Sequence, residues 1–167
     1  MKIAIINEVS ASPRNGDIIR ALEQTTDARL LNVGMKNPDQ LPQLSYIHTS
    51  YMGAMLLNSG ACDFVVGGCG TGQGFINAIL QFPGVFCGLI YEPLDAWLFS
   101  QINGGNCVSL ALNKSRATTS KASPDCTAMI FPVSIKSRYE CAPVSGNGSF
   151  SCAQDASSAQ HSAIETR

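Results

Sequence analysis

The residues best placed for chemistry are Cys69 and Thr71, which lie in the stretch GGCGTGQG at 67–74, just after an apolar run. Glycines at this density let backbone N–H groups approach a ligand, and a helix that follows would add its own unpaired amides. Helix N-termini also favour the ionised form of a nearby thiol. The sequence therefore predicts an anion site at 67–74, with Cys69 as a base or nucleophile and Thr71 as a neutral hydroxyl beside it.

The spacing of this stretch does not fit three common motifs. A P-loop needs Gly-Lys-Ser/Thr, the dinucleotide fingerprint needs an acidic residue about 20 positions further on, and the nucleophile elbow needs glycine at position 71. A glycine-rich turn from strand to helix is otherwise common to phosphate-binding α/β folds. The pattern alone leaves two interpretations open, a catalytic cysteine and an ordinary phosphate-binding turn.

Three motifs together resemble one family. CGTGQG at 69–74 is followed by FPGV at 82–85 and NGGN at 103–106. Their order is similar to the sugar-phosphate isomerase family of ribose-5-phosphate isomerase B and galactose-6-phosphate isomerase, whose pattern reads CGTGxG, xPGI and HNDxN. KIAI at 2–5 and GACD at 60–63 match as well, so the resemblance covers residues 1 to about 113.

The elements that position these motifs alternate between strand and helix. We expect strands at 2–6, 29–33, 64–67, 85–90 and 107–110, and helices at about 17–24, 44–58, 72–81 and 94–102. Strands rich in Ile, Val and Leu that alternate with short helices predict a parallel sheet covered on both faces. The expected fold is a three-layer α/β/α sandwich with a five-stranded, Rossmann-like parallel sheet.

Ligands of such sheets bind at the carboxyl ends of the strands, which brings further residues to the site. Asn7 and Glu8 follow the first strand and stand where the family carries its pair of sugar-hydroxyl ligands. Tyr91 follows the fourth strand, and Tyr46 matches the family segment that opens the second long helix. We expect all four side chains to contact the substrate.

Asn103 and Asn106 precede the fifth strand, so they would reach the site only from the helix end or from a partner subunit. A homodimer with its active site near the interface, expected from the family resemblance alone, accommodates this position. Both residues are predicted to bind substrate.

The resemblance implies that an aldose phosphate and its ketose are interconverted. The Cys69 thiolate would move a proton between the two carbons through an enediolate. Backbone N–H groups around Gly70, Gly72, Gln73 and Gly74 would hold the oxyanion, helped by the Thr71 hydroxyl. This chemistry requires no cofactor and no metal.

The family's ring-opening histidine aligns with Ile102, which cannot transfer protons. Ring opening would then fall to Tyr91, Glu92, Asp95 or His48, unless the substrate is already open-chain. The alternatives to an active isomerase are an inactive or partner-dependent subunit and a non-catalytic module that binds a phosphate ligand.

Composition limits the other function classes. A net charge of −1 without a basic stripe gives no reason to expect nucleic acid or an anionic membrane surface. No apolar run approaches the about 18 residues of a membrane span, and no leader is evident, so we expect a cytoplasmic protein. The seven cysteines show no paired zinc motif, and Cys62, Cys87 and Cys107 are predicted to be plain buried thiols.

The segment after residue 113 differs from the rest. Residues 115–167 contain eleven serines and no leucine, against thirteen leucines before them. We therefore expect a domain at 1–113 and an atypical tail at 114–167, either poorly ordered or translated from a shifted reading frame, and we favour the frame shift. The family's phosphate-binding basic residues have no counterpart there; Arg14, Lys114 and Arg116 are the candidates nearest the site.

Overall fold

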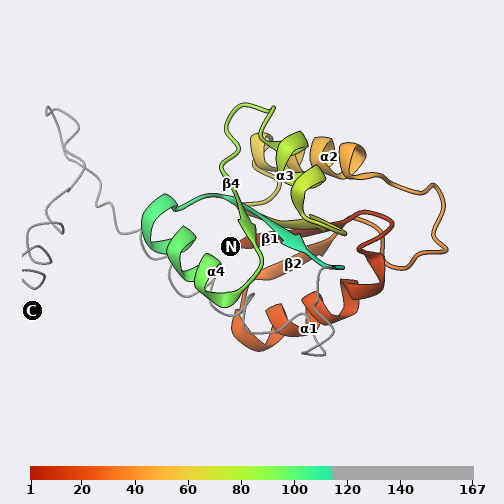
Figure 1. Cartoon of the computed structure of the whole chain (residues 1–167), viewed down its shortest axis with the longest axis horizontal. Coiled ribbons are helices and arrows are strands. Elements are labelled where there is room, and N and C mark those ends of the chain that lie inside the picture. The colour runs from red at the N-terminus through yellow and green to blue at the C-terminus, as the bar shows by residue number, and fades with distance from the viewer. Residues whose placement is uncertain (114–167) are drawn as a thin grey trace, which may run out of the picture.

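Five short strands rich in aliphatic residues form one sheet in the computed structural model, which describes residues 1–113 (Figure 1). They are β1 Lys2–Asn7, β2 Arg29–Asn32, β3 Phe64–Cys69, β4 Cys87–Ile90 and β5 Cys107–Ala111. Every pairing is parallel, and the strand order is β2-β1-β3-β5-β4. The predicted five-stranded parallel sheet is confirmed.

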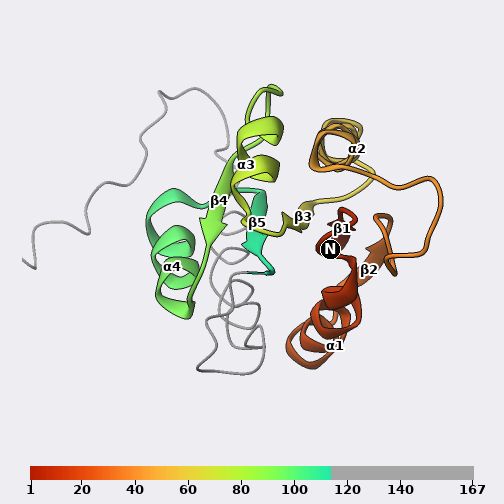
Figure 2. The ribbon, with the colours of Figure 1, turned by 45° about the vertical axis from the view of Figure 1, so that its right-hand side comes forward.

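Helices cover both faces of this sheet. They are α1 Asn15–Thr25, α2 Tyr46–Asn58, α3 Gln73–Ile79 and α4 Pro93–Leu98, with a 3-10 turn at Ser12–Arg14 and a π-helical turn, η2, at Phe99–Asn103. Figure 2 shows α2 and α3 on one side of the strands and α1 and α4 on the other. The three-layer α/β/α, Rossmann-like architecture is therefore also confirmed.

Each face of the sheet has its own apolar cluster. Alternate residues of β1 and β3 point to opposite faces, as a strand period of two requires. Ile3, Ile5 and Val66 pack with α1 and α4, whereas Ile6 and Val65 pack with α2 and α3. Because both faces are covered, β1 and β3 are buried along almost their whole length.

Several predicted boundaries were wrong. β3 continues past 67 to Cys69, and α3 covers 73–79 rather than 72–81, since Gly72 has a φ of 73° that no helical residue adopts. The helix expected at 94–102 is α4 followed by the π-helical turn. β4 begins at Cys87 rather than at 85, and the remaining ends agree with the prediction or differ from it by at most two residues.

The strand order changes direction between β1 and β3. From β1 the chain crosses outward to β2, and it then returns to β3 on the other side of β1. Open α/β sheets bind ligands at such switch points, outside the carboxyl ends of the strands. Here those ends carry Asn7 and Cys69.

Two predictions fall outside this description. The tail at 114–167 and its basic residues Lys114 and Arg116 both lie beyond the described residues.

Within residues 1–113, none of the helices has the length and apolar character that crossing a bilayer requires.

Candidate active site

Cys69 is the last residue of β3 rather than part of the turn. It pairs with Ala111 of β5, and its carbonyl oxygen accepts the N–H groups of Gly72 at 3.3 Å and Leu112 at 3.2 Å. Its side chain is 6% exposed and packs with Phe75 in the cluster beneath α2 and α3. The sulfur is therefore held in one place, at the carboxyl edge of the sheet.

The turn after Cys69 depends on glycine at position 72. Its positive φ disfavours any other residue, and a Cβ atom there would lie 2.5 Å from Leu89. The Gly72 carbonyl accepts the Ser109 hydroxyl at 2.7 Å and the Ile76 N–H at 3.1 Å. These bonds fix the direction in which the following amides point.

Three of the amides predicted to bind an oxyanion already have acceptors. Gly70 donates to the Ser10 hydroxyl at 3.1 Å, Gly72 to the Cys69 carbonyl, and Gln73 to the Thr71 hydroxyl at 3.4 Å. By contrast, the N–H groups of Thr71, Gly74 and Phe75 have no acceptor among residues 1–113. Of the predicted N–H donors, only that of Gly74 remains available. The N–H groups of Thr71 and Phe75 are available as well.

A chain of hydrogen bonds joins β1 to this turn. The Gly70 N–H donates to Ser10, whose hydroxyl donates to a carboxylate oxygen of Glu8. Glu8 is only 5% exposed, and because Asn7 pairs with Gly68, it lies beside Cys69 at the sheet edge. A buried carboxylate and a thiol therefore flank the same turn.

Asn7 is fully buried next to them. Its Nδ2 donates to Asn15 Oδ1 at 3.0 Å, but its own Oδ1 has no donor among the described residues. Buried polar atoms are normally paired, so this oxygen is an acceptor held ready at the edge of the site. The prediction for Asn7 and Glu8 placed them correctly at the strand end.

Asn113 closes the turn from the other side. Its N–H donates to the Gly70 carbonyl at 2.9 Å, and its Nδ2 donates to the Ser10 carbonyl at 3.0 Å. Asn113, Asn15 and Ser109 were all missed by sequence reasoning. Each is a single polar residue whose bonding partner is set by the fold, so no local sequence pattern identifies it as part of the site.

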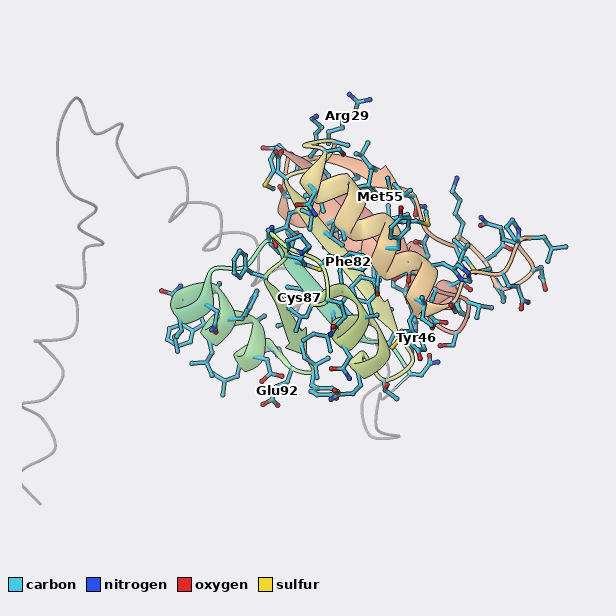
Figure 3. All side chains as sticks on the ribbon, turned by 90° about the horizontal axis from the view of Figure 1, so that it is seen from above. Arg29, Tyr46, Met55, Phe82, Cys87 and Glu92 are labelled. Carbon is cyan, nitrogen blue, oxygen red and sulfur yellow. The ribbon has the colours of Figure 1, made fainter. Side chains whose placement is uncertain are left out.

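Aromatic side chains line the far side of the turn. Gln73 Nε2 donates to the Tyr91 hydroxyl at 2.9 Å, and that hydroxyl lies 3.4 Å from the Thr71 carbonyl. The Tyr46 ring covers Gly74, where a Cβ atom would meet it at 3.0 Å. Figure 3 shows Tyr46 at the end of the molecule opposite Arg29, the first residue of β2. The structure thus gathers Thr71, Gln73, Gly74, Tyr46 and Tyr91 at the carboxyl edge of the sheet.

Asn103 and Asn106 lie at the opposite, amino edge, because both precede β5. The Asn106 Oδ1 accepts the Phe86 N–H and its Nδ2 donates to the Gly84 carbonyl, each at 2.8 Å. Both ends of this side chain are therefore occupied in holding the turn before β4. Within one chain, neither asparagine meets Cys69.

The other candidates for ring opening serve as helix caps. His48 Nδ1 accepts the Ser45 N–H at 3.1 Å in the capping box of α2. Asp95 accepts the N–H groups of Tyr91 at 2.9 Å and Glu92 at 3.2 Å, and Glu92 completes the capping box of α4. Of the four, Tyr91 alone is placed against the Cys69 turn by its side chain.

Charge near the site is sparse. Arg14 follows β1 and pairs with Asp17 at 3.4 Å, and Arg20 approaches the same carboxylate at 3.3 Å. No three His, Cys, Asp or Glu side chains within residues 1–113 are arranged to hold a metal ion.

Comparison with known proteins bears on this site. A family model described as Ribose/Galactose Isomerase matches residues 3–126. The chain belongs to the ribose/galactose isomerase family. The match extends beyond residue 113, where we expected the resemblance to end. No curated protein sequence matches the chain.

Solved structures of the ribose/galactose isomerase family share the fold. A 4-deoxy-L-threo-5-hexosulose-uronate ketol-isomerase is 40% identical with a TM-score of 0.72, and the match covers 81% of this chain and 64% of that one. A ribose-5-phosphate isomerase from Vibrio parahaemolyticus is 40% identical, with a TM-score of 0.73 and coverages of 78% and 63%. This chain therefore spans less than two thirds of either relative. A type B ribose 5-phosphate isomerase from Trypanosoma brucei, 22% identical with a TM-score of 0.69 and coverages of 79% and 85%, has the same fold.

Proposed function

We propose that this chain is an aldose–ketose isomerase acting on an acidic sugar, in the first instance a sugar phosphate. The observation that carries the proposal is the position of Cys69 at the switch point of the sheet, directly before a turn whose Thr71, Gly74 and Phe75 amides have no acceptor among residues 1–113. An enediolate reaction needs a base for the carbon-bound proton and donors for the oxygen that becomes negative. Membership of the ribose/galactose isomerase family supports this assignment.

Cys69 is the base in this proposal. Its thiolate takes the proton from the carbon beside the carbonyl, the electron pair forms the enediolate double bond, and the proton returns to the neighbouring carbon. The Thr71 and Gly74 amides stabilise the oxyanion, and such preorganised donors usually contribute the largest share of rate enhancement. The electrons stay within the substrate, so the step requires no cofactor.

Glu8 and Ser10 supply the oxygen side of the reaction. Isomerisation also moves a proton between the two sugar oxygens, which calls for a second acid–base group near the first. Glu8 lies beside Cys69 and is bonded to the Ser10 hydroxyl, while the unpaired Asn7 Oδ1 can accept a sugar hydroxyl. Tyr91, held by Gln73, is the group we assign to ring opening.

A sugar acid is the second candidate substrate. One of the 40% identical relatives is a uronate ketol-isomerase, and Arg14 in this chain already shares Asp17 with Arg20. A phosphate dianion gains most from several cations or a bidentate arginine, whereas a carboxylate is satisfied by fewer donors. A carboxylate would therefore suit the sparse positive charge of the described part of the chain.

We further propose a homodimer. Large apolar side chains are exposed on and next to α4, and a monomer rarely shows so many together. Asn103 ends the same segment, so an interface there would bring it toward a partner subunit, with Asn106 supporting the turn behind it. The exposed residues are Phe86, Leu94, Trp97, Leu98 and Ile102.

Proton exchange in heavy water tests the chemistry directly. The full chain is incubated with a panel of pentose phosphates, hexose phosphates and uronates, and deuterium at the carbon beside the carbonyl is measured. We expect exchange with one class, a loss of about 100-fold or more in Cys69→Ser, and no change in the control Cys62→Ala, whose buried thiol lies at the other end of β3.

Each contrary result points to a specific alternative. Equal exchange by wild type and Cys69→Ser would refute the cysteine base. Ligand binding without any exchange would identify a non-catalytic module, and exchange that appears only when a longer relative is added would identify a partner-dependent subunit.

A further inference from the structure

Cys87 and Cys107 face each other across the β4–β5 pair. They are register partners in parallel strands, and such partners point to the same face of a sheet whose strands are about 4.8 Å apart. Cys107 is fully buried in the cluster beneath α2 and α3, and Cys87 packs against that cluster. The two side chains therefore converge on one place.

Both thiols are free and close together. The pKa of Cys107 is raised well above its usual value, first by burial and then by a hydrogen bond with the Cys87 thiol. Each sulfur also lies near a backbone carbonyl, at 3.8 Å from Gly88 for Cys87 and 3.9 Å from Val108 for Cys107. The result is a pair of thiols held side by side.

The pair is reachable from outside. β4 is an edge strand of the sheet, and Cys87 is only partly buried there. Figure 3 shows Cys87 near Phe82, and both side chains pack at the margin of the α2–α3 cluster. A small reagent that meets Cys87 first would find Cys107 directly behind it.

The proposed isomerase chemistry does not use this pair. Along β5, Cys107 is the partner of Val65 whereas Ala111 is the partner of Cys69, so the pair and the catalytic thiol lie at opposite ends of that strand. Ligand binding at one end can be measured separately from turnover at the other.

We propose that Cys87 and Cys107 together bind a soft electrophile that takes two sulfur ligands. Trivalent organic arsenic is the representative compound of this class. Each thiol forms one arsenic–sulfur bond, and the arsenic-bound oxygen leaves as water with the two thiol protons. No atom changes oxidation state, and neutral thiols are sufficient. Sulfur ligands select soft ions, and the second bond is intramolecular, which multiplies the affinity of the first.

Phenylarsine oxide is the probe for this site. The full chain is treated with it, unfolded, alkylated at the remaining thiols and mapped by mass spectrometry. We expect one arsenical that protects Cys87 and Cys107 together from alkylation. Cys87→Ser and Cys107→Ala should each weaken binding by at least about 100-fold, because a single thiol cannot chelate.

Two controls keep the result specific. Cys62→Ala removes a buried thiol of the same cluster that lies outside the pair and should leave affinity unchanged, as should Cys69→Ser. An arsenical mapped to any other cysteine, or unchanged affinity in Cys87→Ser, would overturn the proposal. The map of the wild-type chain needs no variant, and Cys87 lies on an edge strand, so the test does not depend on how Cys107→Ala folds.

Discussion

Glu8 is the residue whose environment most needs a functional explanation. It is a carboxyl group buried directly after β1, and among the described residues its side chain bonds only to the Ser10 hydroxyl. Ser10 in turn receives the Gly70 N–H, so the position of Glu8 and the shape of the Cys69 turn are coupled. A group that only stabilised the fold would not need to be an acid at this place.

Replacing the carboxyl group of Glu8 by an amide tests whether this residue has a functional role. Glu8→Gln keeps the size of the side chain and its acceptor for Ser10 but removes the acid–base function. We expect kcat to fall about 100-fold or more with little change in KM.

The matched control is Glu23→Gln on the exposed side of α1, which should behave as wild type. A fall in thermal stability without a change in kcat would assign Glu8 a structural role only.

At the scale of elements, the approach of α3 to β3 depends on Gly67. A Cβ atom there would lie 2.1 Å from the ring of Phe75, which is fully buried, so the ring cannot move into solvent. Gly67→Ala should therefore destabilise the protein by about 2–3 kcal/mol through overpacking. Urea unfolding monitored by circular dichroism measures this change in the free energy of unfolding.

Gly16→Ala is the contrasting variant, because a Cβ atom at that position in α1 meets nothing within 4 Å. It should raise the free energy of unfolding by about 0.5–1 kcal/mol, since alanine favours the helix. Equal effects of the two substitutions would contradict the packing argument.

Sequence patterns predicted the elements well and their ends less well. The aliphatic runs around Ile5 and Val66 were sufficient to predict buried parallel strands. The end of β3 was missed because Cys69 is paired by Ala111, and the late start of β4 because Asn106 takes the Phe86 N–H. Both errors come from contacts between segments far apart in the chain.

For the candidate site, the sequence predicted the location of several residues but not the hydrogen bonds among them. The strand-end rule placed Asn7, Glu8, Thr71 and Tyr91 at one edge, because it depends on the topology alone. The rule does not say which amides of the turn remain unpaired. That depends on Ser10, Ser109 and Asn113, whose bonds to the turn join residues 37 to 60 positions apart in sequence.

At the scale of the whole molecule, buried thiols make stability depend on pH. Burial raises the pKa of Cys62 and, more strongly, that of Cys107. In the unfolded chain these thiols ionise above about pH 8.5, whereas the folded state keeps them protonated. Their contribution is fully present below that pH and is lost as pH rises through the folded pKa, by up to about 1.4 kcal/mol per pH unit and thiol.

Urea unfolding between pH 7 and pH 10 measures this dependence. Cys107→Ala should flatten the alkaline decrease in the free energy of unfolding, whatever its effect at neutral pH. An identical decrease in wild type and in Cys107→Ala would mean that other groups cause it.

The proposed dimer makes a separate prediction. Cys69→Ser and Asn103→Ala chains should each be inactive alone if Asn103 serves the site of the partner subunit. Mixed after unfolding and refolding together, they should recover about a quarter of wild-type exchange activity, because half of the dimers would contain one intact site. Recovery of none, or sedimentation as a monomer, would exclude a shared site.

The bonds from Leu112 to Cys69 and from Asn113 to Gly70 and Ser10 also have a consequence for synthesis on the ribosome. The nascent chain cannot complete the turn until Asn113 has left the exit tunnel, although every other part of that turn is translated much earlier. Until β5 arrives, the edge of β3 is open to other strands, so a ribosome that stalls before codon 107 would release an aggregation-prone fragment.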